Sequence, residues 1–295
     1  MRLNLRREAG HNAQMRYTIL VVGSIDAHLT GHVFATDPRS PPPPPRNSPR
    51  LSGERAPWWV TVTANGSVGH GSRFIEPTAM EQIINVSRRA LDFRKEQKDA
   101  LFGEGKHAGC SHAVAASKKK TIGDVTSLNI TTMQAGVDAG NGVMCKNMVP
   151  PTATATFDIR ISPNMEPTEM KEKLDLWCRE CEVPGGELKW GFFDSHNNMM
   201  THHTTPIDQT WPWFSRFQAG VGKSDIAVLP GVFPAATDSR FLRALGIRAL
   251  GFSPMRNSEI LLHEYNESLR REVYEEGLEV YVKLIEHLAS VADDF

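Results

Sequence analysis

The chain has 295 residues, in which 33 lysines and arginines are balanced by 34 aspartates and glutamates. This balance gives no overall attraction to nucleic acid or to a membrane surface, and no apolar run is long enough to span a bilayer, so we expect neither partner. The 4 cysteines are too few and too scattered for a disulfide framework and favour a cytoplasmic location.

Residues 1–53 differ in composition from the rest of the chain. They contain several arginines but no lysine, and Pro41–Pro45 is an uninterrupted proline run that favours extended structure. The apolar stretch Thr18–Ile25 is a candidate for a short strand or for a weak signal-peptide core. It lacks a clear cleavage site, which favours the strand. We expect the remainder of this segment to be a mostly disordered leader.

A strand and a glycine-rich loop follow from Pro57. The alternation of Val60 and Val62 with threonines predicts a half-buried strand, which Asn65–Gly66 ends. The loop then presents His70 between two glycines, where backbone can approach a ligand closely. An ordinary surface histidine is the alternative interpretation.

Five further elements are predicted before residue 194. They are a helix from Glu76 through the apolar stripe at 83–93, strands at 125–133 and 152–161, a helix at 167–181 and a strand at 187–193. The order strand, helix, strand, strand, helix, strand predicts a ferredoxin-like βαββαβ arrangement in a chain of the mixed α/β (α+β) class. Cys178 and Cys181 continue the apolar face of the second helix, which favours core positions over a metal or redox site.

The strand Trp58-Trp59-Val60 followed by Gly69-His70-Gly71-Ser72 resembles the start of the lid, or dimerisation, domain of the M20 family of zinc-dependent amidohydrolases. The resemblance implies that His70 reaches across a dimer into the neighbouring active site, where it helps to hold the scissile carbonyl as it becomes an oxyanion. Asn147-Met-Val-Pro150 matches the end of a family hairpin whose asparagine contributes to the same site. A turn asparagine is an equally open interpretation of Asn147.

The last third of the sequence predicts a second region that contains both helices and strands. We expect a helix at 212–217, a broken strand at 226–233, a helix at 241–245, a strand at 248–252 and a closing helix from about 268 to 291.

Three motifs in this region resemble M20 enzymes that act on N-acyl-L-amino acids. They are the segment that ends at Arg240, the Gly-Phe-Ser-Pro sequence at 251–254, and Leu-Leu-His at 261–263. The resemblance implies that Arg240 binds the α-carboxylate of the substrate, that Gly251, Phe252 and Ser253 line the pocket for its side chain, and that His263 binds one of two zinc ions.

The family takes its other zinc ligands and its general base from His-x-Asp, aspartate and Glu-Glu motifs in a preceding half. This sequence has no His-x-Asp, and its Glu275–Glu276 lies within the closing helix. A zinc pair needs more ligands than one histidine. We therefore expect a leader at 1–53, a lid at 54–197 and the carboxyl-terminal part of a catalytic domain at 198–295.

The resemblance implies a homodimeric hydrolase that converts N-acyl-L-amino acids to a carboxylate and a free L-amino acid with two zinc ions. Because the ligand set is incomplete, we expect the chain to be inactive alone. The alternative is a non-catalytic module that pairs through its lid with a full-length member of the family. An incomplete gene model is a third interpretation, and the insertions near 103–120 and 137–146 have no assigned role.

Overall fold

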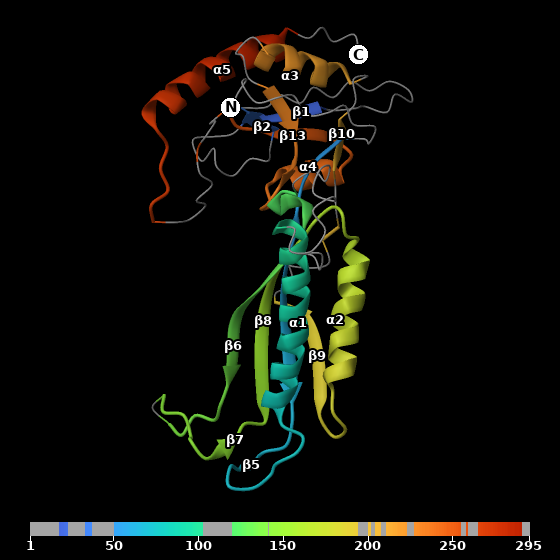
Figure 1. The fold of residues 1–295 in the computed structure, drawn as a ribbon, viewed down its shortest axis with the longest axis vertical. Helices are drawn as coiled ribbons and strands as arrows, with labels where there is room; N and C mark the ends of the chain where they lie inside the picture. Colours follow the sequence, from blue (N-terminus) through green and yellow to red (C-terminus); the bar gives the residue numbers. More distant parts are fainter. Residues whose placement is uncertain are drawn as a thin grey trace, which may run out of the picture.

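The computed structural model describes residues 18–22, 33–36, 50–102, 120–140, 142–193, 200–201, 204–207, 211–222, 227–254, 258 and 265–290. These residues form an elongated molecule with a lower part, residues 56–193, and an upper part built from residues 18–54 and 200–290 (Figure 1). No helix in the described ranges is long and apolar enough to cross a membrane.

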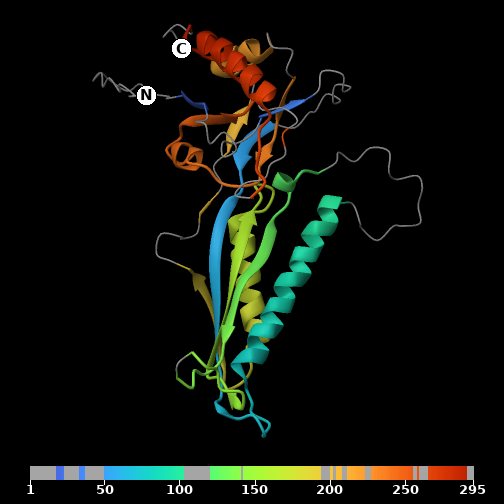
Figure 2. The same ribbon diagram turned by 90° about the vertical axis from the view of Figure 1, so that its left-hand side faces the viewer.

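The lower part contains one antiparallel sheet and two long helices. Its elements are β4 (Ala56–Asn65), α1 (Ala79–Phe102), β6 (Ser127–Ala135), β8 (Thr152–Ile161), α2 (Pro167–Cys181) and β9 (Glu187–Phe192). The sheet order is β6-β8-β4-β9, with every neighbouring pair antiparallel. This is the order of a ferredoxin-like βαββαβ fold, and the predicted fold class is confirmed. Figure 2 shows α1 along one side of the sheet.

Apolar and polar residues alternate along the strands, so the sheet has one buried face and one more exposed face. Trp58, Val60 and Val62 of β4 are fully buried with Phe157 and Ile159 of β8 in a core that also includes residues of both helices. The intervening threonines lie on the other face, where the hydroxyls of residues 61 and 156 are 3.1 Å apart. The period-2 pattern in the sequence therefore follows from burial of one face only.

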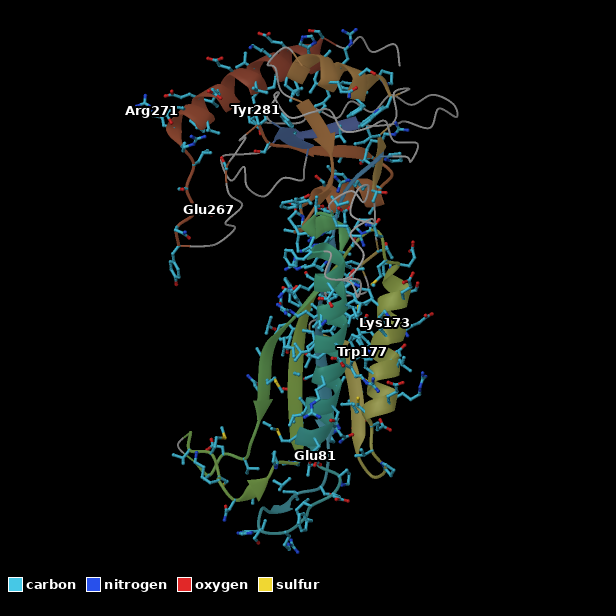
Figure 3. The ribbon with its side chains drawn as sticks, in the orientation of Figure 1. Glu81, Lys173, Trp177, Glu267, Arg271 and Tyr281 are labelled. Carbon is cyan, nitrogen blue, oxygen red and sulfur yellow. The ribbon has the colours of Figure 1, made fainter. Side chains whose placement is uncertain are left out.

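The helix α2 buries one stripe against the sheet and α1. Trp177 packs against Phe93 of α1 with ring centroids 5.8 Å apart (Figure 3). Cys178 and Cys181 lie in the same stripe, both free and buried. The predicted core positions of the two cysteines are therefore confirmed. Burial raises the pKa of the Cys178 thiol to about 12, which suppresses the reactive thiolate.

Short elements complete the lower part. The strands β5 (Gly69–His70) and β7 (Met148–Val149) pair at its lower end, and the 3-10 helix η2 (Ile122–Asp124) lies near its upper end (Figure 1).

The upper part consists of short strands covered by helices. Its strands are β1 (Thr18–Val22), β2 (Val33–Thr36), β3 (Arg50–Glu54), β10 (Thr205–Ile207), β11 (Ala227–Pro230), β12 (Val232–Phe233) and β13 (Arg248–Phe252). Its helices are α3 (Pro212–Gly222), α4 (Ser239–Ala244) and α5 (Arg271–Ala289). Phe217 and Phe252 meet edge to face with ring centroids 5.1 Å apart, in a core that α3, β13 and α5 share.

The three amino-terminal strands pair with strands from the last third of the chain. The strand β1 is parallel to β13, β2 is antiparallel to β11, and β3 lies between β10 and β12. The sequence predicted only the first of these strands. For β2 and β3 the structure differs from the expected disordered leader, because their pairing partners lie far along the chain and leave no local pattern.

A buried ion pair joins β3 to α4 within the upper part. Arg243 Nη1 lies 3.3 Å from Glu54 Oε1, with the two side chains only 3% and 5% exposed. Arg243 also donates to the Ala249 carbonyl oxygen and to Thr205 Oγ1, and the Thr237 N–H donates to Glu54. Burial raises the pKa of Glu54 above its usual value, although the Thr237 hydrogen bonds and the Arg243 charge act against that shift.

We predict that Arg243→Met lowers the free energy of unfolding by about 3 kcal/mol, because it leaves the Glu54 carboxylate buried without its cation. Chemical denaturation measures this change. Lys171→Met is the matched control: its pair with Asp175 is about half exposed, so its loss is expected to change stability by less than about 0.5 kcal/mol. Equal effects of the two substitutions would contradict the assignment of a structural role to the buried pair.

We also predict that alkylation of the folded chain at mildly alkaline pH modifies Cys145 much faster than Cys178. At a pKa of about 12 instead of the usual 9.0, the thiolate fraction of Cys178 is about a thousandfold smaller. Cys145 is only half-buried. Peptide mass mapping measures both rates, and the denatured chain is the control in which the difference disappears. Comparable rates in the folded chain would show that Cys178 is not held in the core.

Candidate functional site

The side chains of His70 and Asn147 meet at the lower end of the molecule, where β5 and β7 pair (Figure 1). His70 Nε2 lies 3.0 Å from Asn147 Nδ2, although the two residues are 77 positions apart in the sequence. The register that places Gly69 opposite Val149 and His70 opposite Met148 brings them together. Both side chains are exposed, so the pair is open to a ligand.

The loops of His70 and Asn147 are joined by a backbone hydrogen bond. The Gly71 N–H donates to the Asn147 carbonyl oxygen at 2.7 Å. A Cβ atom at Gly69 would lie 2.5 Å from Ile75 Cδ1, so a larger residue there would displace the end of the Ile75 side chain. A Cβ atom at Gly71 would lie 3.4 Å from the Asn147 carbonyl oxygen, which is ordinary contact. The backbone hydrogen bond therefore holds the two loops together where the His70 and Asn147 side chains touch.

The insertion near 137–146 folds back on itself. Asp138 forms a bridge with Met144, and the Cys145 N–H donates to the Val137 carbonyl oxygen at 2.8 Å. The extra residues thus form a hairpin that returns the chain to Asn147. The insertion near 103–120 lies almost entirely outside the described residues.

Ser72 orients the His70 ring, a role that the sequence analysis did not assign. Its Oγ lies 2.8 Å from Nδ1 of the ring, and its N–H lies 3.2 Å from the same nitrogen. A hydroxyl can accept from Nδ1–H or donate to an unprotonated Nδ1, so Ser72 supports either neutral tautomer. The only signal for this role in the sequence was the position of Ser72, two residues after the histidine.

The pair can present two N–H donors to one oxygen atom. The Asn147 amide Nδ2 can only donate, so its 3.0 Å contact with His70 is a hydrogen bond when Nε2 of the ring is unprotonated. With the proton on Nε2 this bond is lost, and both N–H groups can donate to a bound oxygen instead. Two converging donors stabilise the negative charge that develops on a carbonyl oxygen during acyl transfer. The two converging donors therefore suit an oxyanion.

The tip, which we define as residues 66–78 and 136–150, lies at the opposite end of the molecule from α4 and β13 (Figures 1 and 2). Between the two ends, β4 and β8 pair over 10 residues. Such a strand spans about 34 Å. His70 and Arg240 of one chain therefore cannot contact the same small substrate.

Arg240 lies in the first turn of α4. Its Nε is buried and has no hydrogen-bond partner among the described residues, and its guanidinium carbon lies 4.6 Å from the centroid of the Phe241 ring. A buried donor without a partner is available to a ligand acceptor. This environment is compatible with the predicted carboxylate-binding role, which stays a prediction.

The predicted pocket residues begin on β13. Gly251 and Phe252 are buried at its end, and Ser253 follows the strand. The Phe252 ring packs against Phe217 and Tyr281, and its carbonyl oxygen accepts a hydrogen bond from the Tyr281 hydroxyl at 3.2 Å. Phe252 therefore lies in the core of the upper part. A substrate pocket lined by residues 251–253 stays a prediction.

The described residues do not fit a zinc pair. Within the described ranges, no three histidine, cysteine, aspartate or glutamate side chains gather into a group that could hold a metal ion. His263, the expected zinc ligand, lies outside the described residues. Glu275 lies on α5 and is ion-paired with Arg271, as expected for a solvated helix face. We therefore derive no chemical step through a metal on this chain.

Comparison with known proteins identifies relatives that match most of this chain. Residues 52–185 match the M20 peptidase dimerisation domain. The chain is 41% identical over 241 residues to aminoacylase-1 of Dictyostelium discoideum, and the alignment covers 81% of this chain and 54% of that protein. Human aminoacylase-1 is 34% identical over 238 residues, and the alignment covers 81% of this chain and 52% of the human protein. The chain thus spans about half the length of these relatives.

Two solved structures share the fold at low sequence identity. The dipeptidase Dug1p of Saccharomyces cerevisiae has a TM-score of 0.51 at 15% identity and covers 89% of this chain and 58% of its own. A tripeptidase of Staphylococcus aureus has a TM-score of 0.52 at 12% identity, and the match covers 83% of this chain and 56% of the tripeptidase. The matched domain and the similarity to aminoacylase-1 identify the chain as a relative of aminoacylase-1 that contains an M20 peptidase dimerisation domain.

Proposed function

We propose that this chain forms the dimerisation domain and part of the catalytic domain of an aminoacylase-type hydrolase, which cleaves N-acyl-L-amino acids to a carboxylate and a free L-amino acid. Its tip serves the active site of a full-length aminoacylase subunit, and two copies of this chain pair through the same domain without forming a complete active site. The observation that carries the proposal is the His70–Asn147 pair, whose nitrogens lie 3.0 Å apart on an exposed loop.

The position of the pair supports action on a second subunit. The length of the β4–β8 pairing separates the tip from Arg240, which is the expected carboxylate ligand. A substrate bound at Arg240 is therefore out of reach of the His70 of the same chain. A tip from a neighbouring subunit removes this restriction, which is why we place the acting histidine across a dimer.

The exposed surface of the tip also supports docking. Several large apolar side chains are exposed there: Val68, Phe74, Val143, Met144 and Met148. Clustered exposed apolar side chains favour an interaction surface. Cover by a partner would also exclude water from the His70–Asn147 pair, and hydrogen bonds to an oxyanion are much stronger in such an environment.

His70 and Asn147 would hold the scissile carbonyl in this proposal. Both would donate to its oxygen as the tetrahedral intermediate forms, and Ser72 would accommodate the ring tautomer that places the proton on Nε2. The activated water would come from the metal centre of the served site, which holds two zinc ions by family resemblance. Because the described residues of this chain offer no such ligand group, we assign it the carbonyl-holding role. The cytoplasmic location stays a prediction.

A complementation assay tests the role of His70. Full-length aminoacylase-1 whose own matching histidine has been replaced by alanine is mixed with this chain, and hydrolysis of N-acetyl-L-methionine is followed. We predict that the wild-type chain restores turnover and that the His70→Ala chain restores at least about a hundredfold less, the effect expected from loss of an oxyanion donor.

The matched control is His287→Ala, which changes the other histidine in the described ranges, on α5 far from the tip. It should restore turnover as well as the wild-type chain does. Gel filtration of each mixture shows whether the subunits pair. Formation of the mixed dimer with equal rescue by the wild-type and His70→Ala chains would reject the catalytic role of His70, and absence of mixed dimers would reject pairing with the full-length enzyme.

A further inference from the structure

A cavity of about 380 Å³ lies where the carboxyl end of α1, the helix η2 and the start of β6 meet. This volume is within the range of small-molecule sites. The cavity is near the junction of the lower and upper parts and far from the tip. The proposed hydrolytic function does not use it.

Three cationic side chains line this cavity, which we call the junction cavity: Arg55, Arg94 and Lys98. Arg94 and Lys98 are four residues apart on α1 and therefore lie on the same face of the helix. Arg94 donates to the Asn129 side-chain oxygen at 3.2 Å. None of the three cations forms an ion pair with a described carboxylate, and no acidic residue is among the described residues that line the cavity.

Three acidic residues close in sequence or space to this region have other partners. Asp158 forms a two-point contact with Arg160, at 2.7 and 3.0 Å. Asp99 is ion-paired with Lys95 at 2.6 Å. Asp124 accepts hydrogen bonds from the Thr121 backbone and hydroxyl. These neighbours therefore offset the positive charge of the junction cavity only in part, through the charge of Asp158 near Arg55.

Arg55 is the most informative of the three cations because it is only 6% exposed. Its Nε donates to the Pro234 carbonyl oxygen at 2.6 Å, and its Nη1 donates to Ser127 Oγ at 2.8 Å. Nη2 has no partner among the described residues. Burial, together with the nearby charge of Arg160, lowers the pKa of Arg55 to about 10, although the charge of Asp158 acts against that shift. A buried cation without a carboxylate is costly, and a bound anion would remove this cost.

The remaining wall of the junction cavity is largely apolar. Leu101 and Phe102 of α1, Ile122 of η2, and Val125 and Leu128 line it. Phe102 is exposed, so this wall is accessible to a ligand. A ligand that matched both walls would carry a negative charge at one end and an apolar group at the other.

We propose that the junction cavity binds a small organic carboxylate with an apolar tail. Its carboxylate lies among Arg55, Arg94 and Lys98, and its tail lies against the leucine and phenylalanine side chains of α1. A guanidinium offers the paired donors that a carboxylate accepts. Because Arg55 connects β3 to β4 and also bonds Pro234, the ligand binds at the residue that links the two parts of the chain.

Calorimetric titration of the full chain with hexanoate tests the proposal. We expect saturable binding, and tighter binding than acetate because each additional buried methylene group contributes favourably. Arg94→Gln and Lys98→Gln are expected to weaken hexanoate binding by at least about tenfold each, because each removes a charged donor. Both side chains are exposed, so these variants should fold.

The matched control is Lys95→Gln, which removes an exposed lysine of the same helix that does not line the cavity. It should alter the affinity by less than about twofold. No saturable binding of hexanoate, or equal affinities in all three variants and the wild type, would overturn the site. Hexanoate binding no tighter than acetate, or tighter binding of inorganic phosphate than of hexanoate, would overturn the assigned ligand class. The assay measures no hydrolysis, so its outcome is independent of the proposed function.

Discussion

The antiparallel pairing of β4 with β8 is the interaction on which the other features of the molecule depend. It runs without a register shift from Ala56 opposite Ile161 to Asn65 opposite Thr152. At one end the two strands lead into the loops that form the tip, and at the other they approach the buried Glu54–Arg243 pair. A rigid pair of strands thus fixes the distance between the oxyanion-type donors and the expected substrate-binding residues.

This separation explains why dimerisation and chemistry are linked in our account. A histidine and an asparagine at the end of a long sheet can be placed accurately only if the sheet itself is well packed, and the core around Trp58 and Phe157 provides that packing. Within the described ranges the tip offers donors and an apolar surface but no group that could hold a metal ion, so in our account it acts on chemistry that other residues supply. Docking of the tip on a partner combines water exclusion with the positioning of the donors.

Sequence reasoning was most successful where structure follows local pattern. The strand at 152–161 and the helix at 167–181 were predicted with the bounds that the structure has, since strict alternation marks the first and an early proline and a helical apolar stripe mark the second. The strands β2 and β3 left no such pattern, because distant partners stabilise them. The contact between His70 and Asn147 also depends on how the hairpin before Asn147 closes. The spacing of residues in the sequence does not reveal how it closes.

The claim tested most directly by one experiment is that this chain contributes donors to a hydrolytic site but does not contain a complete one. The measurement is the zinc content of the purified chain, with hydrolysis of an N-acetyl-L-amino acid followed in the same sample. Our account predicts no stoichiometric zinc and no turnover by the chain alone. About two zinc ions per chain together with turnover would contradict it, and would place a complete ligand set within these 295 residues.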